Sequence, residues 1–328
     1  MVIHDDIQMI RERLEQAETI AVFTHVRPDG DSVGSVLSLG WALMDMGKNV
    51  QLIAEDPIPE RFHFLFRYTE DGKNPFISAP DHADCYILPD ISSIDRAGSF
   101  FEKHPEVRPD ICIDHHVSNT MYAKLNWIES DSPAACSVLS RFLPLLGIRI
   151  TPRISSALLC GVLTDTNSFS TSNVTADSLR SAADLVDIGA NIFSINMQAY
   201  KEHSLDEMNL WRLGMNNIRM EGDMIWSVLT KADRDKIGYT GDDDVGFVSY
   251  MGNTKGMNVS VIFIEIDDNE TKISWRSRPG YDVSKVAVAC GGGGHKAAAG
   301  ATVYGKIGDI IPAVLEKTRA ILASARDQ

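Results

Sequence analysis

Short apolar, β-branched segments alternate with segments of helical periodicity through the first half of this 328-residue chain. The run TIAVFT at residues 19–24 has the composition of a buried parallel strand, and residues 31–46 follow it with apolar side chains at helical spacing. Further strands are expected at residues 49–54, 85–88 and 111–113, and further helices at residues 134–146, 152–163 and 176–188. Strands that alternate with helices imply a parallel sheet with helices on both faces.

The second half follows a different pattern. Residues 224–229, 257–266 and 272–276 have the composition of strands in a more antiparallel sheet, and residues 309–325 have that of an amphipathic helix. We therefore predict three segments: an α/β domain with a parallel sheet at residues 1–195, a helical linker at 196–220, and a smaller α/β domain with a mixed sheet at 221–328.

The charge balance restricts the class of partner. The 31 lysines and arginines face 45 aspartates and glutamates, which gives a net charge of −14. A protein that binds long nucleic acid usually has a basic surface, so we expect short substrates and no long duplex. Because no apolar run could cross a bilayer and residues 1–14 lack a signal-peptide pattern, we expect a cytoplasmic protein without a membrane partner. The five cysteines form no CxxC pair and are expected to be buried apolar side chains.

Polar clusters lie at the ends of four of the predicted elements. They are His25-Val26-Arg27-Pro28-Asp29-Gly30-Asp31 after the first strand, Asp90 after CYILP, Asp114-His115-His116 after ICI, and Asp165 after the apolar run 157–163. In open α/β sheets, ligands bind beyond the carboxyl ends of the strands. We therefore expect all four clusters at one edge of the sheet.

Each cluster alone has a simpler structural explanation. Asp31 alone would be a helix N-cap and Asp29-Gly30 a turn, and a single His25 or Asp90 is more often a cap or a surface residue. The pair His115-His116 is less easily explained in this way, because two adjacent imidazoles would point to opposite sides of an extended chain. Capping does not explain polar clusters at four successive element ends, so the joint pattern favours a functional site.

Carboxylates gathered this closely need cations. Asp29, Asp31, Asp90 and Asp165 would repel one another and could not all remain ionised without them. Carboxylates with a minority of imidazoles form an oxygen-rich ligand set that suits Mn²⁺, with Mg²⁺ or Co²⁺ as alternatives. Two divalent cations about 4 Å apart can activate a water and stabilise the attacking and leaving oxygens of a phosphoryl displacement. The residues therefore predict a metal-dependent phosphoesterase.

Several segments resemble the motifs of the DHH phosphoesterase family. They are HVRPDGDSVGS at 25–35, Asp90, IDHHVSN at 113–119 and GVLTDT at 161–166, followed by SWRSR at 274–278 and GGGGHKAAAG at 291–300. The last two resemble the C-terminal domain of the shorter members, and the resemblance spans nearly the whole chain. Within the family, the length of the chain and its C-terminal motifs are similar to those of the bacterial oligoribonuclease and pAp-phosphatase branch, which is the nanoRNase type.

The resemblance also implies a role for each site residue. Six residues would hold the metals, namely His25 and Asp29 for one ion, Asp31, His115 and Asp165 for the other, and Asp90 bridging the two. The catalytic set would be Asp90, Asp114 and His116. Asp114 would orient an imidazole, and His116 would face the phosphate, either stabilising charge or donating a proton to the leaving oxygen.

The second domain carries residues suited to an anionic substrate. Arg276 and Arg278 lie two apart on a predicted strand, so both can face one side, and guanidinium groups make bidentate phosphate contacts. The glycine run, with Gly292, Gly293 and Gly294 followed by His295, can bring backbone N–H groups close to an anion. The resemblance implies that this domain binds the substrate while the first domain cuts it. Trp275 is expected in the core.

The leading hypothesis is an exonuclease that degrades short single-stranded oligoribonucleotides to mononucleotides and removes the 3′-phosphate of pAp. A phosphodiesterase for linear dinucleotides such as pApA, in cyclic-dinucleotide breakdown, is one alternative. An inorganic pyrophosphatase or exopolyphosphatase is another, and a nucleotide-binding module without turnover is the alternative that is not an enzyme. The sequence leaves a homodimer open.

Overall fold

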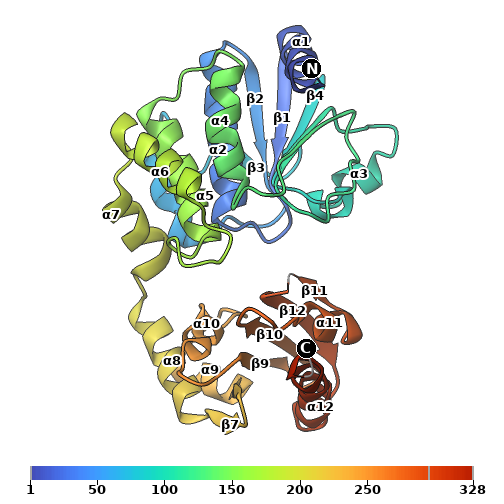
Figure 1. Cartoon of the computed structure of the whole chain (residues 1–328), viewed down its shortest axis with the longest axis vertical. Helices are drawn as coiled ribbons and strands as arrows, with labels where there is room; N and C mark the ends of the chain where they lie inside the picture. Colours follow the sequence, from blue (N-terminus) through green and yellow to red (C-terminus); the bar gives the residue numbers. More distant parts are fainter. Residues whose placement is uncertain (1, 295, 327–328) are drawn as a thin grey trace. The chain divides into compact units, whose positions relative to one another are not determined.

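The computed structural model describes residues 2–294 and 296–326. The chain divides between Glu202 and His203 into two compact units, called here the first and the second unit (Figure 1). The division falls within the stretch 196–220 that the sequence predicts as a linker. The separate functions expected of the two domains stay predictions.

The first unit contains a six-stranded sheet, and every neighbouring pair of strands is parallel. Its strands are β1 (Thr19–Phe23), β2 (Asn49–Ile53), β3 (Phe76–Ile77), β4 (Cys85–Pro89), β5 (Ile111–Asp114) and β6 (Leu125–Ile128), in the order β3-β2-β1-β4-β5-β6. The chain adds β2 and β3 on one side of β1, and then β4, β5 and β6 on the other side, so the strand order reverses between β1 and β4. In open parallel sheets, ligands bind at this point, beyond the carboxyl ends of the strands. The predicted parallel sheet is confirmed.

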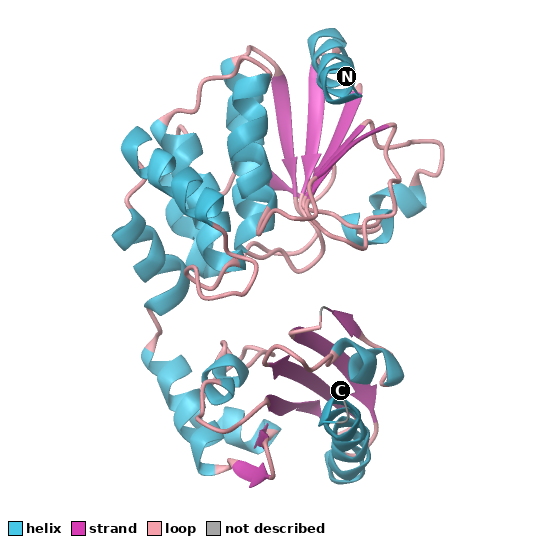
Figure 2. Cartoon of the chain, viewed as in Figure 1, coloured by secondary structure: helices cyan, strands magenta, loops and turns pink. Residues whose placement is uncertain are grey.

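Helices cover both faces of this sheet (Figure 2). They are α1 (Val2–Gln16), α2 (Gly30–Asp45), α3 (Phe100–Lys103), α4 (Ala135–Leu145), α5 (Pro152–Asp165), α6 (Ala176–Ile188) and α7 (Ile192–Asn196), with the short η1 (Glu60–Tyr68), η2 (Ile94–Ala97) and η3 (Met197–Lys201). Ile20 and Val22 of β1 pack into the larger core, while Ala21 and Phe23 pack into a second core that includes Phe101 of α3. Alternate side chains of one strand thus reach opposite layers, as expected for a covered parallel sheet.

Helices α2 and α5 cross closely because each carries a glycine at the contact. A Cβ atom on Gly34 would lie 2.4 Å from the carbonyl oxygen of Ala157, and a Cβ atom on Gly161 would lie 2.6 Å from Oδ1 of Asp31. Contacts this short leave no room for any side chain. Asp165 is the last residue of α5, so the close crossing brings it toward Asp31 at the start of α2.

The second unit contains a six-stranded mixed sheet, as predicted. Its strands are β7 (Arg219–Glu221), β8 (Met224–Leu229), β9 (Val259–Asp267), β10 (Glu270–Ser277), β11 (Gly293–Gly294) and β12 (Ala298–Tyr304), in the order β11-β12-β10-β9-β8-β7. Among the described residues of this unit, only β8 and β9 pair in parallel. Its helices are α8 (Leu205–Asn216), α9 (Lys231–Ile237), α10 (Phe247–Gly252), α11 (Ser284–Ala289) and α12 (Ile307–Arg326). Trp275 is buried, as expected, and its Nε1 donates to Oγ1 of Thr318 on α12 at 3.2 Å.

Two further expectations can be compared with the fold. Cys85, Cys112, Cys136 and Cys160 are buried and free, as predicted, whereas Cys290 is only half-buried. Among the described residues, no helix combines the length and the apolar character that a bilayer crossing needs.

Candidate metal centre

The polar residues that follow β1, β4 and β5 meet the last residue of α5 at one edge of the parallel sheet. Two separate groups of side chains form there, His25 with Asp29 and Asp90, and Asp31 with His115 and Asp165, and a third group overlaps both by joining Asp90 and His115 with Asp114 and His116. Within each group, one potential ligand atom per residue lies within 4.8 Å of the others. The predicted convergence of the four sequence clusters is therefore what the structure shows.

Asp90 lies between the two groups. Its Oδ2 is 3.7 Å from Nε2 of His25, and its Oδ1 is 3.5 Å from Nε2 of His115, so its two oxygens face different groups. It follows β4 directly, is 3% exposed, and has a φ of +58°, in the left-handed region that residues other than glycine rarely adopt. Such backbone strain concentrates at functional sites, where the surrounding structure enforces it.

Hydrogen bonds set the orientation of both imidazoles. Nδ1 of His25 lies 2.8 Å from the carbonyl oxygen of Val26, and Nδ1 of His115 lies 3.2 Å from that of Ser132. Because a carbonyl only accepts, each Nδ1 can take part in these bonds only as the donor. Each Nε2 then faces carboxylates, and that of His115 lies 3.5 Å from Oδ2 of Asp165. Metal-binding histidines are oriented in the same way.

Asp31 is fixed by the start of α4. Its Oδ2 accepts a hydrogen bond from the backbone N–H of Ala135 at 2.6 Å, and its Oδ1 accepts one from Cys136 at 2.9 Å. These are first-turn amides of a helix whose own N-cap, Ala134, has no capping side chain. The N-cap of α2 is Asp29, whose Oδ1 accepts from the amide of Asp31 at 3.0 Å. The simple explanation of Asp31 as the cap of its own helix is therefore wrong.

The electrostatics of the two groups show a shortage of positive charge. Burial by itself lowers the pKa of a histidine, yet nearby carboxylates raise the pKa of His25 to about 9 and that of His115 to about 10. Burial and the charge of Asp90 raise the pKa of Asp31 to about 7. Burial and the charge of Asp31 also raise the pKa of Asp165 well above its usual range.

The donor set fits divalent cations. Within residues 2–294 and 296–326, the ion-pair partners of the four carboxylates in these groups are histidines, and no lysine or arginine lies within 4.0 Å of them. Carboxylate oxygens with two imidazoles are ligands for hard or borderline divalent ions. The two groups can therefore each hold a divalent cation.

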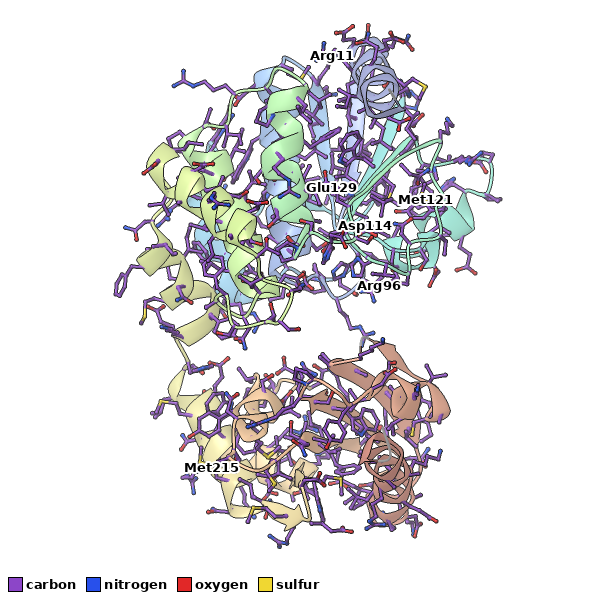
Figure 3. The ribbon with its side chains drawn as sticks, viewed as in Figure 1. Arg11, Arg96, Asp114, Met121, Glu129 and Met215 are labelled. Carbon is purple, nitrogen blue, oxygen red and sulfur yellow. The ribbon has the colours of Figure 1, made fainter. Side chains whose placement is uncertain are left out.

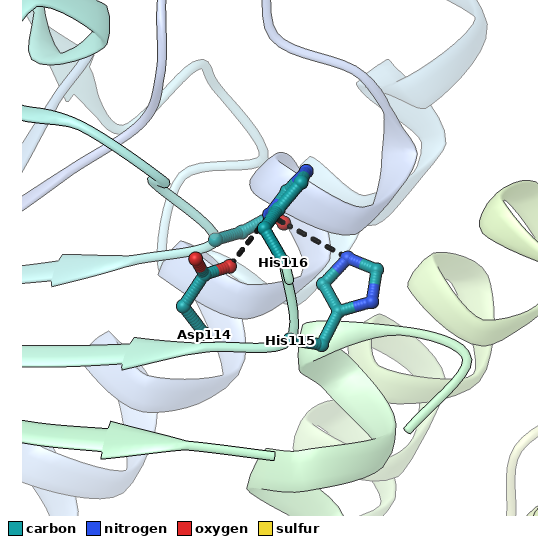
Figure 4. A group of neighbouring side chains, drawn as sticks. Asp114, His115 and His116 are labelled. Carbon is teal, nitrogen blue, oxygen red and sulfur yellow. Dashed lines mark hydrogen bonds and ion pairs between the residues drawn. The ribbon is translucent and has the colours of Figure 1, made fainter. Parts of the chain in front are cut away.

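Asp114 and His116 form a hydrogen-bonded pair beside these groups (Figure 4). Nδ1 of His116 lies 2.7 Å from Oδ1 of Asp114, and Nδ2 of Asn119 donates to Oδ2 of Asp114 at 2.7 Å. Asp114 is fully buried; although burial raises its pKa, His116 and Asn119 lower it to about 2. Asp114 is therefore a charged acceptor that holds the His116 ring.

The expectation that the two adjacent histidines point to opposite sides is wrong. The ring centroids of His115 and His116 lie 4.6 Å apart, and both rings approach Asp90. Strand β5 ends at Asp114, and the chain then turns, with the amide of Asn119 donating to the carbonyl of His116 at 3.1 Å. The alternation of an extended strand no longer applies after Asp114.

Two further residues lie at the site without having been singled out from the sequence. Asn119 is part of the segment IDHHVSN, but nothing in its spacing indicates a bond to Asp114. Arg96 follows β4 on η2, and its Nη2 lies 3.3 Å from Nδ1 of His25. In Figure 3, Arg96 and Asp114 are labelled at the same edge of the first unit.

The predicted substrate-binding residues lie in the second unit. Arg276 of β10 pairs with Ala298 of β12, next to the pairing of Gly294 with Ala299. Arg278 follows β10, and its Nη2 donates to the carbonyl oxygen of Thr254 at 3.1 Å. The roles of both arginines stay predictions.

The glycine run has a local structural reason as well. A Cβ atom on Gly292 would lie 2.1 Å from the carbonyl oxygen of Gly300, so this glycine is needed for the close approach of β12. Gly293 pairs with Gly300 in the β11–β12 ladder. His295 lies outside the described residues. Contacts of this run with a substrate stay predictions.

Comparison with known proteins agrees with the motifs. The family description "DHH family, N-terminal domain" matches residues 19–162, and "DHHA1 domain" matches residues 222–324. The bifunctional oligoribonuclease and PAP phosphatase NrnA of Thermus thermophilus is 30% identical over 98% of this chain and 96% of its own length. The protein of the same name from Bacillus subtilis is 26% identical over 88% of this chain and 90% of its own length.

A solved structure shows the same fold. The exopolyphosphatase-related protein from Bacteroides fragilis is similar with a TM-score of 0.89 and 21% sequence identity, covering 98% of each chain. The chain belongs to the DHH family of phosphoesterases.

Proposed function

We propose that this protein hydrolyses short single-stranded oligoribonucleotides to mononucleotides and removes the 3′-phosphate of pAp, with two divalent cations, Mn²⁺ by preference. The observation that carries the proposal is the position of Asp90, whose two oxygens face two separate groups of ligands. The names of the Thermus thermophilus and Bacillus subtilis relatives, which match over most of both chains, support the choice of substrate.

The ligands divide between the ions by group. His25 and Asp29 would hold one cation, Asp31, His115 and Asp165 the other, and Asp90 would bridge them. When bound, the two cations supply Lewis-acid charge and lower the pKa of a water. Carboxylates outnumber imidazoles in both groups and no thiolate takes part, which supports Mn²⁺ over a thiolate-preferring ion.

The chain's own residues prepare the leaving-group side. Asp114 accepts a hydrogen bond from Nδ1 of His116, which fixes the ring. His116 would then face the phosphate and either stabilise charge or donate a proton to the leaving oxygen. Asn119 holds the second oxygen of Asp114 and so prevents rotation of that carboxylate.

The net charge supports short substrates. At −14, the protein repels a long polyanion unless a local basic surface receives it, whereas a dinucleotide or pAp carries only a few charges. A cytoplasmic location and a homodimer stay predictions, and size-exclusion chromatography of the purified protein tests the second.

Hydrolysis by the purified protein in Mn²⁺ tests the proposal. pAp, labelled RNA of two to five nucleotides, a long RNA and pyrophosphate would be offered in parallel, with the Asp90→Ala variant as the control. We expect release of AMP from pAp and of mononucleotides from the short RNA, slow turnover of the long RNA, and no activity in the variant. Turnover of pyrophosphate alone would assign a pyrophosphatase, and binding without turnover would assign a nucleotide-binding module.

A further inference from the structure

We propose that Arg96, with its neighbour Arg27, forms a binding site for a second phosphate group of the substrate, next to the phosphate that is cleaved. The proposal rests on the phosphoesterase function proposed above and adds a rule for substrate choice. Molecules with two phosphates close together, such as pAp or an oligonucleotide with a neighbouring phosphodiester, would be selected over molecules with one.

The position of Arg96 is the first observation. Its Nη2 lies 3.3 Å from Nδ1 of His25, while Nε2 on the other side of the same imidazole lies 3.6 Å from Asp29 and 3.7 Å from Asp90. One imidazole ring therefore separates the guanidinium from the metal-ligand group. This separation is suited to a phosphate beside the reacting one rather than to the reacting phosphate itself.

The backbone holds Arg96 and Arg27 on adjoining loops. The amide of Val26 donates to the carbonyl oxygen of Arg96 at 2.8 Å, and the amide of Arg27 donates to Oδ2 of Asp56 at 2.6 Å. Arg27 has a φ of +53°, a conformation that its surroundings must enforce. Both side chains are exposed, so a ligand can reach them.

The two guanidinium groups are available to a ligand. Some arginines of the first unit pair with carboxylates, as Arg13 does with Asp110 and Arg141 with Glu129. In the described part of the chain, neither Arg27 nor Arg96 has an Asp or Glu oxygen within 4.0 Å of its guanidinium, although the acidic residues outnumber the basic ones by 45 to 31. Guanidinium groups bind phosphate oxygens in a bidentate manner.

Charge balance explains why a second phosphate needs these residues. With two divalent cations bound, the four carboxylates of Asp29, Asp31, Asp90 and Asp165 would leave the site neutral. The charge of the cleaved phosphate would then make the site negative, so a second phosphate would meet negative charge there and on the protein as a whole, which carries −14. Arg96, whose guanidinium lies beside the His25 ring, supplies positive charge at short range, and Arg27 adds to it from the adjoining loop.

A pair of substrates isolates the second phosphate. Adenosine 3′-monophosphate has the same 3′-phosphate as pAp and lacks the 5′-phosphate. We expect Arg96→Ala to lower kcat/KM for pAp about 10- to 100-fold, the range of charge-assisted hydrogen bonds, and to change that for the monophosphate less than about threefold. Arg27→Ala should act in the same direction and more weakly, and Arg96→Lys should restore part of the loss.

Arg149→Ala is the matched control. Arg149 is exposed, forms no ion pair within the described ranges, and follows α4, whose first-turn amides bind Asp31. The 11 residues of α4 span about 16 Å, which places Arg149 far from the site. Its removal changes the net charge by the same amount as the removal of Arg96, so any general charge effect appears in both variants.

Binding gives a second readout. With Ca²⁺ in place of Mn²⁺, calorimetry would measure the affinity ratio of pAp to adenosine 3′-monophosphate, with chromatography confirming that the nucleotides stay intact. We expect this ratio to fall about tenfold or more in Arg96→Ala and to stay unchanged in Arg149→Ala. An equal loss for both nucleotides would overturn the proposal and make Arg96 a positioning residue for His25; no loss for either would also overturn it.

The outcomes also separate this proposal from the proposed function. If the wild-type protein hydrolyses neither nucleotide but the affinity ratio depends on Arg96, the phosphoesterase function fails and the second-phosphate site stands. If pAp is hydrolysed and the ratio does not depend on Arg96, the function stands and the site fails.

Discussion

The buried carboxylates at the two ends of strand β5 have different kinds of partner. Asp110, just before the strand, is 2% exposed, and its Oδ1 lies 3.0 Å from both Nε of Arg13 and Nζ of Lys124. Its Oδ2 also accepts from the amide of Tyr86 at 3.0 Å. Asp114, at the other end of the strand, has a histidine and an asparagine as partners and lies beside the carboxylates of the metal centre.

The difference separates a structural carboxylate from functional ones. At the amino end of the sheet, the side chains of Arg13 and Lys124 supply the positive charge, so the burial of the Asp110 carboxylate is compensated within the chain. At the carboxyl end, the ion-pair partners of the four carboxylates among the described residues are histidines, and this compensation must come from outside the chain. A buried acid near other acids and without lysine or arginine therefore indicates a metal site more strongly than an acid that is merely buried.

Removal of the shared carboxylate should have the largest effect on turnover. Asp90→Ala leaves both ligand groups without their common member, and we expect the rate to fall more than about a hundredfold. Saturating Mn²⁺ should stabilise the wild type, by about 2.7 kcal/mol at one hundred times the dissociation constant, and this gain should be lost in the variant. Thermal melts with and without Mn²⁺ measure it. Turnover above a tenth of wild type would contradict the bridging role.

Removal of the His116 ring should lower turnover while the metals stay bound. We expect His116→Ala to cost about a hundredfold or more on ribonucleotide substrates, because proton donation to the leaving oxygen is lost. A p-nitrophenyl phosphodiester, whose leaving group needs no proton, should be affected much less. Elemental analysis of the variant measures the metal content, and loss of a metal would make His116 a ligand instead.

Removal of the second partner of Asp114 should have a smaller effect of the same kind. Asn119→Ala frees one oxygen of Asp114, and we expect a loss of about tenfold, as is typical for residues that orient a functional histidine. The ratio of rates on RNA and on the p-nitrophenyl ester should shift in the same direction as for His116→Ala. An equal loss on both substrates would show that Asn119 supports the fold around the site rather than the orientation of His116.

A substitution at the amino end of the sheet should lower the stability of the protein and leave its turnover nearly unchanged. Asp110→Asn keeps the size of the side chain but removes the charge that pairs with Arg13 and Lys124, and we expect the free energy of unfolding to fall by about 1–3 kcal/mol. The kcat per folded molecule should stay within about twofold of wild type. Urea unfolding and active-site titration measure the two quantities. A large loss of kcat in a folded variant would remove the distinction between the two ends.

The local pattern of apolar residues in the sequence was sufficient to predict much of the fold. The apolar run at residues 19–24 and the following helical spacing predicted β1 and α2 to within a residue or so. Strand β6 was missed because all its residues are half-buried, which leaves neither alternation nor an apolar run. Helix α1 was missed although Ile7, Ile10 and Leu14 recur at helical spacing and are buried, because its many charges mask the apolar face.

The sequence by itself determined which residues come together at the candidate metal centre, because the carboxyl ends of parallel strands share one edge and three of the four clusters follow such an end. Only the tertiary structure decided how these residues are held. The amides of Ala135 and Cys136 bind Asp31 across more than a hundred residues of sequence, and Arg96 reaches His25 from another loop. Sequence spacing records periodicity within one element, whereas contacts between distant elements depend on packing that no local pattern encodes.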